Sequence, residues 1–356
     1  MKNKLLAIVA VCTIMLTAGC GNNDYLLDED KNVIVYTETG QQLRNDILCK
    51  PSEGTEIYDL YKEHENQLSF SLDKLPTCEN FKVNSNKTDS MWELIFVKPT
   101  AFAITSIGNI VINLGIAVIL VGILIRLILL PLQIKTSKQS INMRKAGPEL
   151  KKLDKKYENK KDNESQLLKS QEMMAVYKKY NINPLAGCLP ALIQLPIFFA
   201  FLDAIYRIPS IYEGKLLGYN LGMTPYTGIT NGEYQYILLM LMIAGSTYLS
   251  FKHTMSQNPQ TNDESEKQMK TMLNFMTIFI LISSLFFPTA LHFYWIVTYV
   301  FIAIQTTIIN KILGEKEPKN TKKEKTKKDL PNKNTKVNIK EKLDKKEGKK
   351  NGKTSK

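Results

Sequence analysis

The chain has 356 residues, a formal net charge of +13 and 44% hydrophobic residues. It contains no Gly-rich phosphate loop, no GxSxG and no HExxH, which argues against nucleotide-driven and hydrolytic enzymes. The five cysteines form no CxxC pair and the three histidines are scattered, so the sequence predicts no metal site and no cofactor. The basic excess indicates nucleic acid, the ribosome or anionic lipid as a partner.

Residues 1–19 are predicted to be a lipoprotein signal peptide. Two lysines precede a short apolar stretch, and the segment ends in LTAGC, which resembles a bacterial lipobox. Cys20 is then the lipidated residue, carrying palmitate, and the residues that follow lie outside the cell. An ordinary cleavage site and an uncleaved anchor are the alternatives.

Residues 20–90 are polar and mixed, and they predict a small extracellular segment. Cys49 and Cys78 lie within it, where an oxidising compartment permits a disulfide between them. Two free thiols are the alternative. Residues 91–105 begin with aromatic side chains beside a lysine, which is typical of a helix lying in the membrane interface.

Residues 106–134 are long and apolar enough to predict a first transmembrane helix. This helix carries Arg126 well inside the apolar run. A charge at that depth is costly, so it marks a functional site by default. The alternative is that Arg126 extends its guanidinium to the cytoplasmic surface, because the helix should leave the membrane near Pro131 and Lys135.

Residues 135–183 are rich in lysine and carry two sets of apolar residues at helical spacing, which predicts a cytoplasmic helical hairpin. Its charged face is either a docking element or only a solvated surface. The remaining predicted segments, in chain order, are a second span at 184–207, an extracellular loop at 208–232, a third span at 233–251, a cytoplasmic loop at 252–270, a fourth span at 271–287, a fifth span at 290–311 and a disordered Lys-rich cytoplasmic tail at 315–356.

Orientation follows from the lysine and arginine placement, because such residues favour cytoplasmic loops. Segments 135–183 and 315–356 are basic, whereas segment 208–232 contains one lysine, Lys215, and no arginine. The lipobox independently requires an outside N-terminus. The predicted fold is therefore an all-α membrane protein of five spans in the cell membrane. The tail lysines favour ribosomal RNA, anionic lipid or simple solubilisation.

Four blocks of residues resemble the YidC-type membrane protein insertases (the YidC/Oxa/Alb family), in the five-span lipoprotein form of Gram-positive-like bacteria. The blocks are 124–132 (LIRLILLPL), 148–152 (PELKK), 183–190 with 192–199 (NPLAGCLP, LIQLPIFF), and 287–288 with 294–295 (FP, YW). Their order, spacing and predicted topology agree with that family over roughly residues 91–312. Residues 21–90 and the tail lie outside the resemblance.

The resemblance implies five helices around a hydrophilic groove that opens to the cytoplasm and to lipid. It places Arg126 as the charge of that groove and Gln194, Trp295 and Gln305 along its wall. Gln194 is alternatively an interhelical hydrogen-bonding residue, and Trp295 an interfacial or packing residue. The chain departs from the family at Gly122, where many members carry a hydroxyl residue one turn before the arginine.

The function implied is a membrane protein insertase and chaperone, not an enzyme, which inserts nascent membrane proteins alone or with the Sec translocon. The ribosome, signal-recognition targeting factors and membrane lipid are the further expected partners. A small-solute transporter is the alternative, but no internal repeat supports it. A lipid-anchored scaffold is a second alternative, which leaves Arg126 unexplained.

Overall fold

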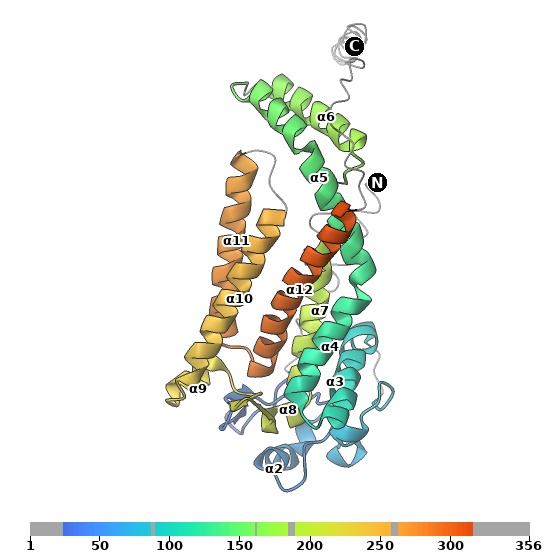
Figure 1. Cartoon of the computed structure of the whole chain (residues 1–356). Helices are drawn as coiled ribbons and strands as arrows, with labels where there is room; N and C mark the ends of the chain where they lie inside the picture. Colours follow the sequence, from blue (N-terminus) through green and yellow to red (C-terminus); the bar gives the residue numbers. More distant parts are fainter. Residues whose placement is uncertain (1–23, 87–89, 161, 184–188, 258–262, 316–356) are drawn as a thin grey trace, which may run out of the picture. The chain divides into compact units, whose positions relative to one another are not determined.

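The computed structural model describes residues 24–86, 90–160, 162–183, 189–257 and 263–315. Within these ranges the chain is mostly helical, in agreement with the all-α prediction, and its strands are very short. Figure 1 shows long helices running alongside one another, with residues 24–86 gathered at one end of them. The predicted lipidation site Cys20 and residues 316–356 of the tail lie outside the described residues.

Residues 24–86, called the cap below, form a small folded unit. Its elements are β1 (Val35–Tyr36) paired antiparallel with β2 (Gln41–Gln42), α2 (Glu56–Glu63) and the 3-10 turns η1 (Glu65–Gln67), η2 (Leu72–Lys74) and η3 (Cys78–Asn80). Leu43, Ile57 and Tyr61 are fully buried in the cap core, together with Tyr212 from the α7–α10 connection. The bundle therefore supplies part of the core that so short a segment needs.

The predicted first span, 106–134, is not one helix. The chain forms the π-helical turn η4 (Glu93–Val97), α3 (Lys98–Val111), α4 (Leu114–Ile128) and α5 (Leu130–Tyr157). Between α3 and α4 it reverses at Ile112, whose φ of 56° is left-handed, and the Asn113 side chain caps α4 by accepting from the Ile116 N–H at 3.1 Å. Residues 106–111 thus extend the helix predicted at 91–105, and α3 packs beside α4.

The segment predicted as a helical hairpin contains most of α5 and all of α6 (Asn163–Lys179), which lie side by side (Figure 1). Leu150 from α5 and Val176 from α6 are buried in a small separate core. Three ion pairs join the two helices along their length: Lys156 with Glu172, Lys169 with Asp154, and Lys179 with Glu149. Charged side chains of the hairpin thus either form ion pairs between the two helices or face solvent.

The rest of the described chain completes the bundle. The elements are α7 (Leu189–Tyr206), α8 (Ser210–Glu213), β3 (Lys215–Leu216) paired with β4 (Tyr219–Asn220), α9 (Pro225–Thr230), α10 (Gln235–Gln257), α11 (Asp263–Ser284) and α12 (Thr289–Glu315). The predicted loop 252–270 is therefore partly helical, because α10 continues into it as far as Gln257 and α11 begins within it at Asp263.

Two helices in the described residues are long and apolar enough to cross a membrane, Glu93–Val111 and Thr289–Leu313. The pair α4 and α5, bent by 59°, makes a third if it counts as one span. The apolar parts of α7 and α11, Ile193–Tyr206 and Leu273–Ser284, are shorter. The count of five spans therefore stays a prediction.

Candidate functional site

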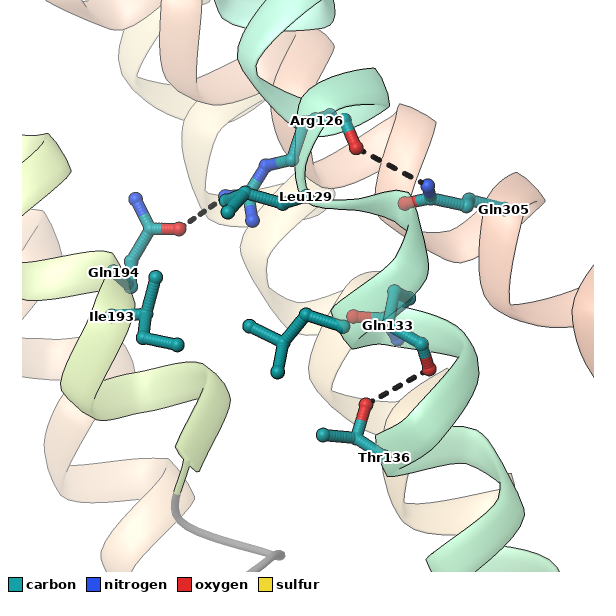
Figure 2. A pocket seen from close by; sticks show the side chains of 8 residues that line it. Arg126, Leu129, Gln133, Thr136, Ile193, Gln194 and Gln305 are labelled. Carbon is teal, nitrogen blue, oxygen red and sulfur yellow. Dashed lines mark hydrogen bonds between the residues drawn. The ribbon is translucent and has the colours of Figure 1, made fainter.

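Arg126 lies in the last turn of α4, where the carbonyl end of a helix favours a cation. Its side chain is half-buried and points toward α7, where a guanidinium N–H donates to the Gln194 side-chain oxygen (Figure 2). Arg126 and Gln194 are 68 positions apart in the sequence. The structure thus brings together two of the residues that the sequence predicted for one site.

Gln194 connects Arg126 to a third helix. Its amide nitrogen donates to the hydroxyl of Tyr294 on α12 at 3.2 Å. Tyr294 is 1% exposed and its ring stacks on Phe201 of α7 at 4.2 Å between centroids. A polar cluster of Arg126, Gln194 and Tyr294 therefore joins α4, α7 and α12.

A small pocket opens beside this cluster (Figure 2). Gln305 of α12 contributes to it and donates from its amide to the Arg126 backbone carbonyl at 3.5 Å. The pocket is lined by Arg126, Leu129, Leu132, Gln133, Thr136, Ile193, Gln194 and Gln305. Its cavity volume of about 20 Å³ leaves room for roughly one water molecule. In this structure the pocket is a notch between α4, α5, α7 and α12.

Trp295 does not line this pocket. It is 8% exposed and stacks on Phe198 of α7 at 5.5 Å, with Phe287 edge-on at 5.8 Å. The structure thus places Trp295 in an aromatic cluster between α7 and α12, and its place on a groove wall stays a prediction.

The absence of a side chain at Gly122 makes room for the Tyr294 ring beside α4. A Cβ at Gly122 would lie 2.7 Å from Cδ2 and 3.1 Å from Cε2 of the Tyr294 ring, closer than real Cβ contacts. The glycine therefore leaves the space that the ring occupies one turn before Arg126. From the sequence, Tyr294 was predicted only as part of the YW motif at 294–295. A signal was present, because Tyr294, Thr298 and Gln305 recur at helical spacing on one face of α12.

The electrostatic setting of Arg126 differs from that of the other buried arginine, Arg207. Arg207 forms ion pairs with Glu93 at 2.9 Å, Asp46 at 3.2 Å and Asp203 at 3.7 Å. In the described part of the chain, no carboxylate forms an ion pair with Arg126, whose guanidinium donates to the neutral amide of Gln194. The charge of Arg126 is therefore oriented but not neutralised.

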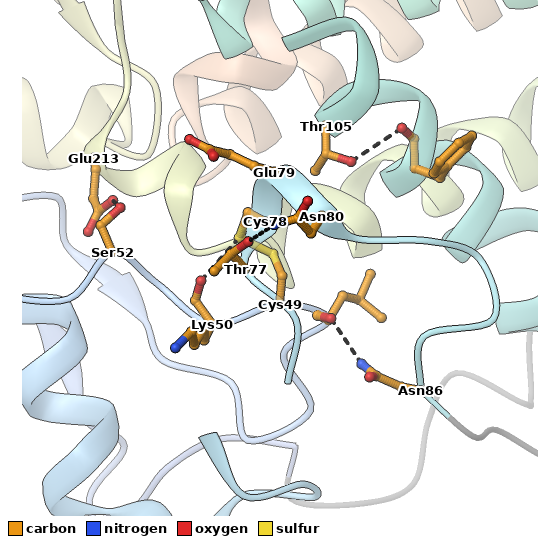
Figure 3. Close-up of a disulfide and its surroundings, with 12 residues drawn as sticks. Cys49, Lys50, Ser52, Thr77, Cys78, Glu79, Asn80, Asn86, Thr105 and Glu213 are labelled. Carbon is orange, nitrogen blue, oxygen red and sulfur yellow. Dashed lines mark hydrogen bonds between the residues drawn. A yellow bond between two sulfur atoms is a disulfide. The ribbon is translucent and has the colours of Figure 1, made fainter. Parts of the chain in front are cut away.

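Other predicted site residues lie elsewhere. Cys49 and Cys78 are joined by a disulfide within the cap, far along the chain from Arg126 (Figure 3). Across the described ranges, no group of His, Cys, Asp and Glu side chains is arranged to hold a metal ion.

The comparison with known families decides the identity of the chain. The family model described as "60Kd inner membrane protein" matches residues 106–317. The chain belongs to the 60Kd inner membrane protein family. The family match includes α4 to α12 and hence every residue of the polar cluster, whereas the cap precedes it.

Relatives of the 60Kd inner membrane protein family support the same assignment. The chain is 38% identical over 232 residues to "Membrane protein insertase YidC" of Oceanobacillus iheyensis, covering 65% of this chain and 88% of that protein. It is 38% identical over 219 residues to "Membrane protein insertase MisCA" of Bacillus subtilis, covering 61% and 78%. It is 37% identical over 228 residues to "Membrane protein insertase YidC 2" of Bacillus anthracis, covering 63% and 82%. The predicted resemblance to YidC-type insertases is confirmed.

Proposed function

We propose that this chain is a membrane protein insertase in which Arg126 receives the polar, acidic end of a nascent membrane protein. The observation that carries the proposal is the absence, within the described residues, of a carboxylate partner for this half-buried cation. The names of the relatives, all membrane protein insertases, give the same activity. The process forms no covalent bond.

The physical argument is one of charge compensation. A charged side chain at the bilayer centre costs about 2.5–3.5 kcal/mol even on the lenient insertion scale. At a separation of 4 Å and an effective dielectric constant of about 20, two opposite charges attract by about 4 kcal/mol. A substrate carboxylate that meets Arg126 therefore offsets the cost of its own transfer, and it relieves the uncompensated arginine as well.

Gln194 acts as a placeholder in this mechanism. Its neutral amide orients the guanidinium while no substrate is present, and it is a weaker partner than a carboxylate. The pocket has room for roughly one water molecule, so a polypeptide end enters only when α4 and α7 separate at this point. Separation breaks the Arg126–Gln194 hydrogen bond and frees the guanidinium for the substrate. The apolar part of the substrate then moves into lipid, driven by about 25 cal/mol per Å² of apolar surface removed from water.

The membrane arrangement that we propose keeps five spans, with the cap outside and the α5–α6 hairpin and tail in the cytoplasm. The lysine and arginine distribution supports this orientation. Contacts at both ends of the η4–α3 helix support its interfacial placement: Glu93 pairs with Arg207, and Asn109 donates to the Glu79 carbonyl of the cap at 2.7 Å. Both partners belong to the end of the bundle that the cap covers. Lipidation at Cys20 anchors the same side.

Nascent membrane proteins are the substrates in this proposal, and lipid receives them. The hairpin, joined to the site through α5, is the element best placed to meet the ribosome, targeting factors or the Sec translocon. The groove that the family resemblance implies corresponds to the pocket beside Arg126 in its opened state.

The test uses purified protein in proteoliposomes and a pair of single-span substrates that differ only in an acidic or neutral outer end. Arg126→Gln keeps a polar side chain but removes the charge, and we expect at least about tenfold slower insertion of the acidic substrate, or about 1.4 kcal/mol. Arg126→Lys should retain part of the rate. Lys135→Gln removes the same charge from an exposed position on α5 and serves as the matched control. Parental insertion of the acidic substrate by Arg126→Gln would refute the proposed role.

A further inference from the structure

Among the contacts between the cap and the bundle, two segments of the cap each hold a different helix. The first is residues 46–50, which lie on the outer end of α7. The Leu48 N–H donates to the Arg207 carbonyl at 2.9 Å, and the Arg207 Nε donates to the Asp46 carbonyl at 2.7 Å. Backbone and side chain of one arginine are thus bonded to neighbouring residues of the cap.

The second segment is residues 78–86, which lie on α3. Asn109 donates to the Glu79 carbonyl at 2.7 Å, and the buried Lys98 ammonium donates to the Asn86 carbonyl. Cys78 and Phe81 are buried in the same apolar core as Val97 and Ala101 of the η4–α3 helix. The contact is therefore both polar and apolar, and it holds α3 near its two ends.

A disulfide joins the two segments. Cys49 and Cys78 are bonded to each other, and they are 0% and 7% exposed (Figure 3). The Asn86 side chain adds a second link by donating to the Leu48 carbonyl at 2.9 Å. We call residues 46–50 and 78–86, with their disulfide, the clamp.

The two helices that the clamp holds lead to the two halves of the polar cluster. α3 packs against α4, which carries Arg126, and α7 carries Gln194. Thirteen residues separate Gln194 from Arg207, which is about 20 Å along a helix. The helix is continuous between the two residues, with Pro196 inside it, and close packing transmits a displacement at Arg207 toward Gln194.

We infer that the clamp is a positioning device: it fixes α7 against the α3–α4 pair from the outer end and thereby holds Gln194 at Arg126. The positions of Gln194 and Arg126 follow from the clamp whatever the protein does. Only the consequence that the clamp controls opening of the site to a substrate rests on the proposed function. Arg207 is the central positioning residue, since its charge is bound by Glu93 beside α3, by Asp46 of the cap and by Asp203 of its own helix. Reduction of the disulfide leaves the Asn86–Leu48 hydrogen bond as a remaining link between the two segments and lets α7 shift more easily.

The test is hydrogen exchange of the full chain in lipid nanodiscs, measured with the disulfide intact and after reduction. We expect about tenfold faster exchange at two places remote from the cysteines, the α7 peptide around Gln194 and the α4 peptide around Arg126, because local opening governs exchange there. Arg207→Met with the disulfide intact should give the same pattern, and Arg207→Lys should restore part of the protection. Glu53→Gln, which breaks only the exposed ion pair between Glu53 and Lys50 at the edge of the clamp, is the matched control and should change neither peptide.

Faster exchange in the cap alone, with both inner peptides unchanged after reduction and in Arg207→Met, would overturn the inference and leave the cap as a covering only. If Arg207→Met does not fold, Glu93→Gln provides the same comparison, since Arg207 then keeps Asp46 and Asp203. Insertion assays on the same samples keep the two ideas apart. A parent chain that inserts nothing refutes the proposed function, whereas the exchange pattern alone decides on the clamp.

Discussion

Adding a single methyl group at Gly122 should disturb the polar cluster more than its size suggests. In Gly122→Ala the new Cβ would meet Tyr294 Cδ2 at 2.7 Å and Thr298 Oγ1 at 3.4 Å. The Tyr294 ring has little freedom to retreat, because it is 1% exposed and stacked on Phe201 at 4.2 Å. Overpacking of this kind costs about 1–3 kcal/mol, which corresponds to a Tm lower by about 2–12 °C. We also expect slower insertion of an acidic substrate, because the displaced Tyr294 hydroxyl loses Gln194.

The assay is thermal unfolding of the detergent-solubilised protein, followed by circular dichroism, beside proteoliposome insertion. Gly245→Ala is the control: Gly245 also lies in a long helix, α10, but a Cβ there meets nothing within 4 Å. Alanine at that position should be neutral or stabilising by up to about 1 kcal/mol. Tyr294→Leu introduced into Gly122→Ala should recover part of the lost stability, since the two sites are in contact. If Gly122→Ala unfolds at the parental temperature, the ring is not held as described.

Three further predictions concern single side chains. Gln194→Glu should place a permanent carboxylate beside Arg126 and preserve the fold. Because this carboxylate already neutralises the guanidinium, insertion of an acidic substrate into proteoliposomes should be about tenfold slower or more. An unchanged rate would exclude the placeholder role of Gln194. Leu150→Ala should destabilise the α5–α6 hairpin by about 2–5 kcal/mol, whereas the exposed Leu167→Ala should stay within about 0.5 kcal/mol, as measured by hydrogen exchange of α6. Hydrogen bonds from Lys62 and Ser71 lower the pKa of Glu65 from 4.5 to about 2. This group therefore stabilises the folded cap above pH 4.5 and loses that effect as the pH falls toward 2. Glu65→Gln should flatten the pH dependence of cap unfolding in that window, and a parental pH profile would contradict this reading.

The sequence was sufficient to predict the helical class, because long apolar stretches are visible in it. The family resemblance, and not the hydropathy pattern, put Arg126 and Gln194 into one site. The reversal at Ile112 was not predictable in the same way. Hydropathy is continuous across it, neither glycine nor proline marks it, and a β-branched residue rarely takes a positive φ. Contacts with the cap and with β3, where Asn113 donates to the Lys215 carbonyl at 3.0 Å, accompany that turn.

Trp295 and Tyr294 show the limit of assigning roles from a motif. The two are neighbours on α12 and differ in direction, so one faces the aromatic cluster and the other faces Gln194. Sequence proximity cannot tell which of them reaches the polar site, because that depends on the rotation of α12 about its axis. The space left by Gly122 settles it, and its contact with Tyr294 is known only once α4 and α12 are in place.

The bend between α4 and α5 links movements of the hairpin to the position of Arg126. The axis changes by 59° around Leu129, three residues from Arg126, and α5 then continues for 28 residues, or about 42 Å. A swing of its far tip by about 4 Å corresponds to a rotation of only about 5° at the pivot. A macromolecule that binds the far end of the hairpin and displaces it therefore rotates α5 slightly at the bend beside Arg126. Binding of cargo at the hairpin can in this way change the position of the guanidinium.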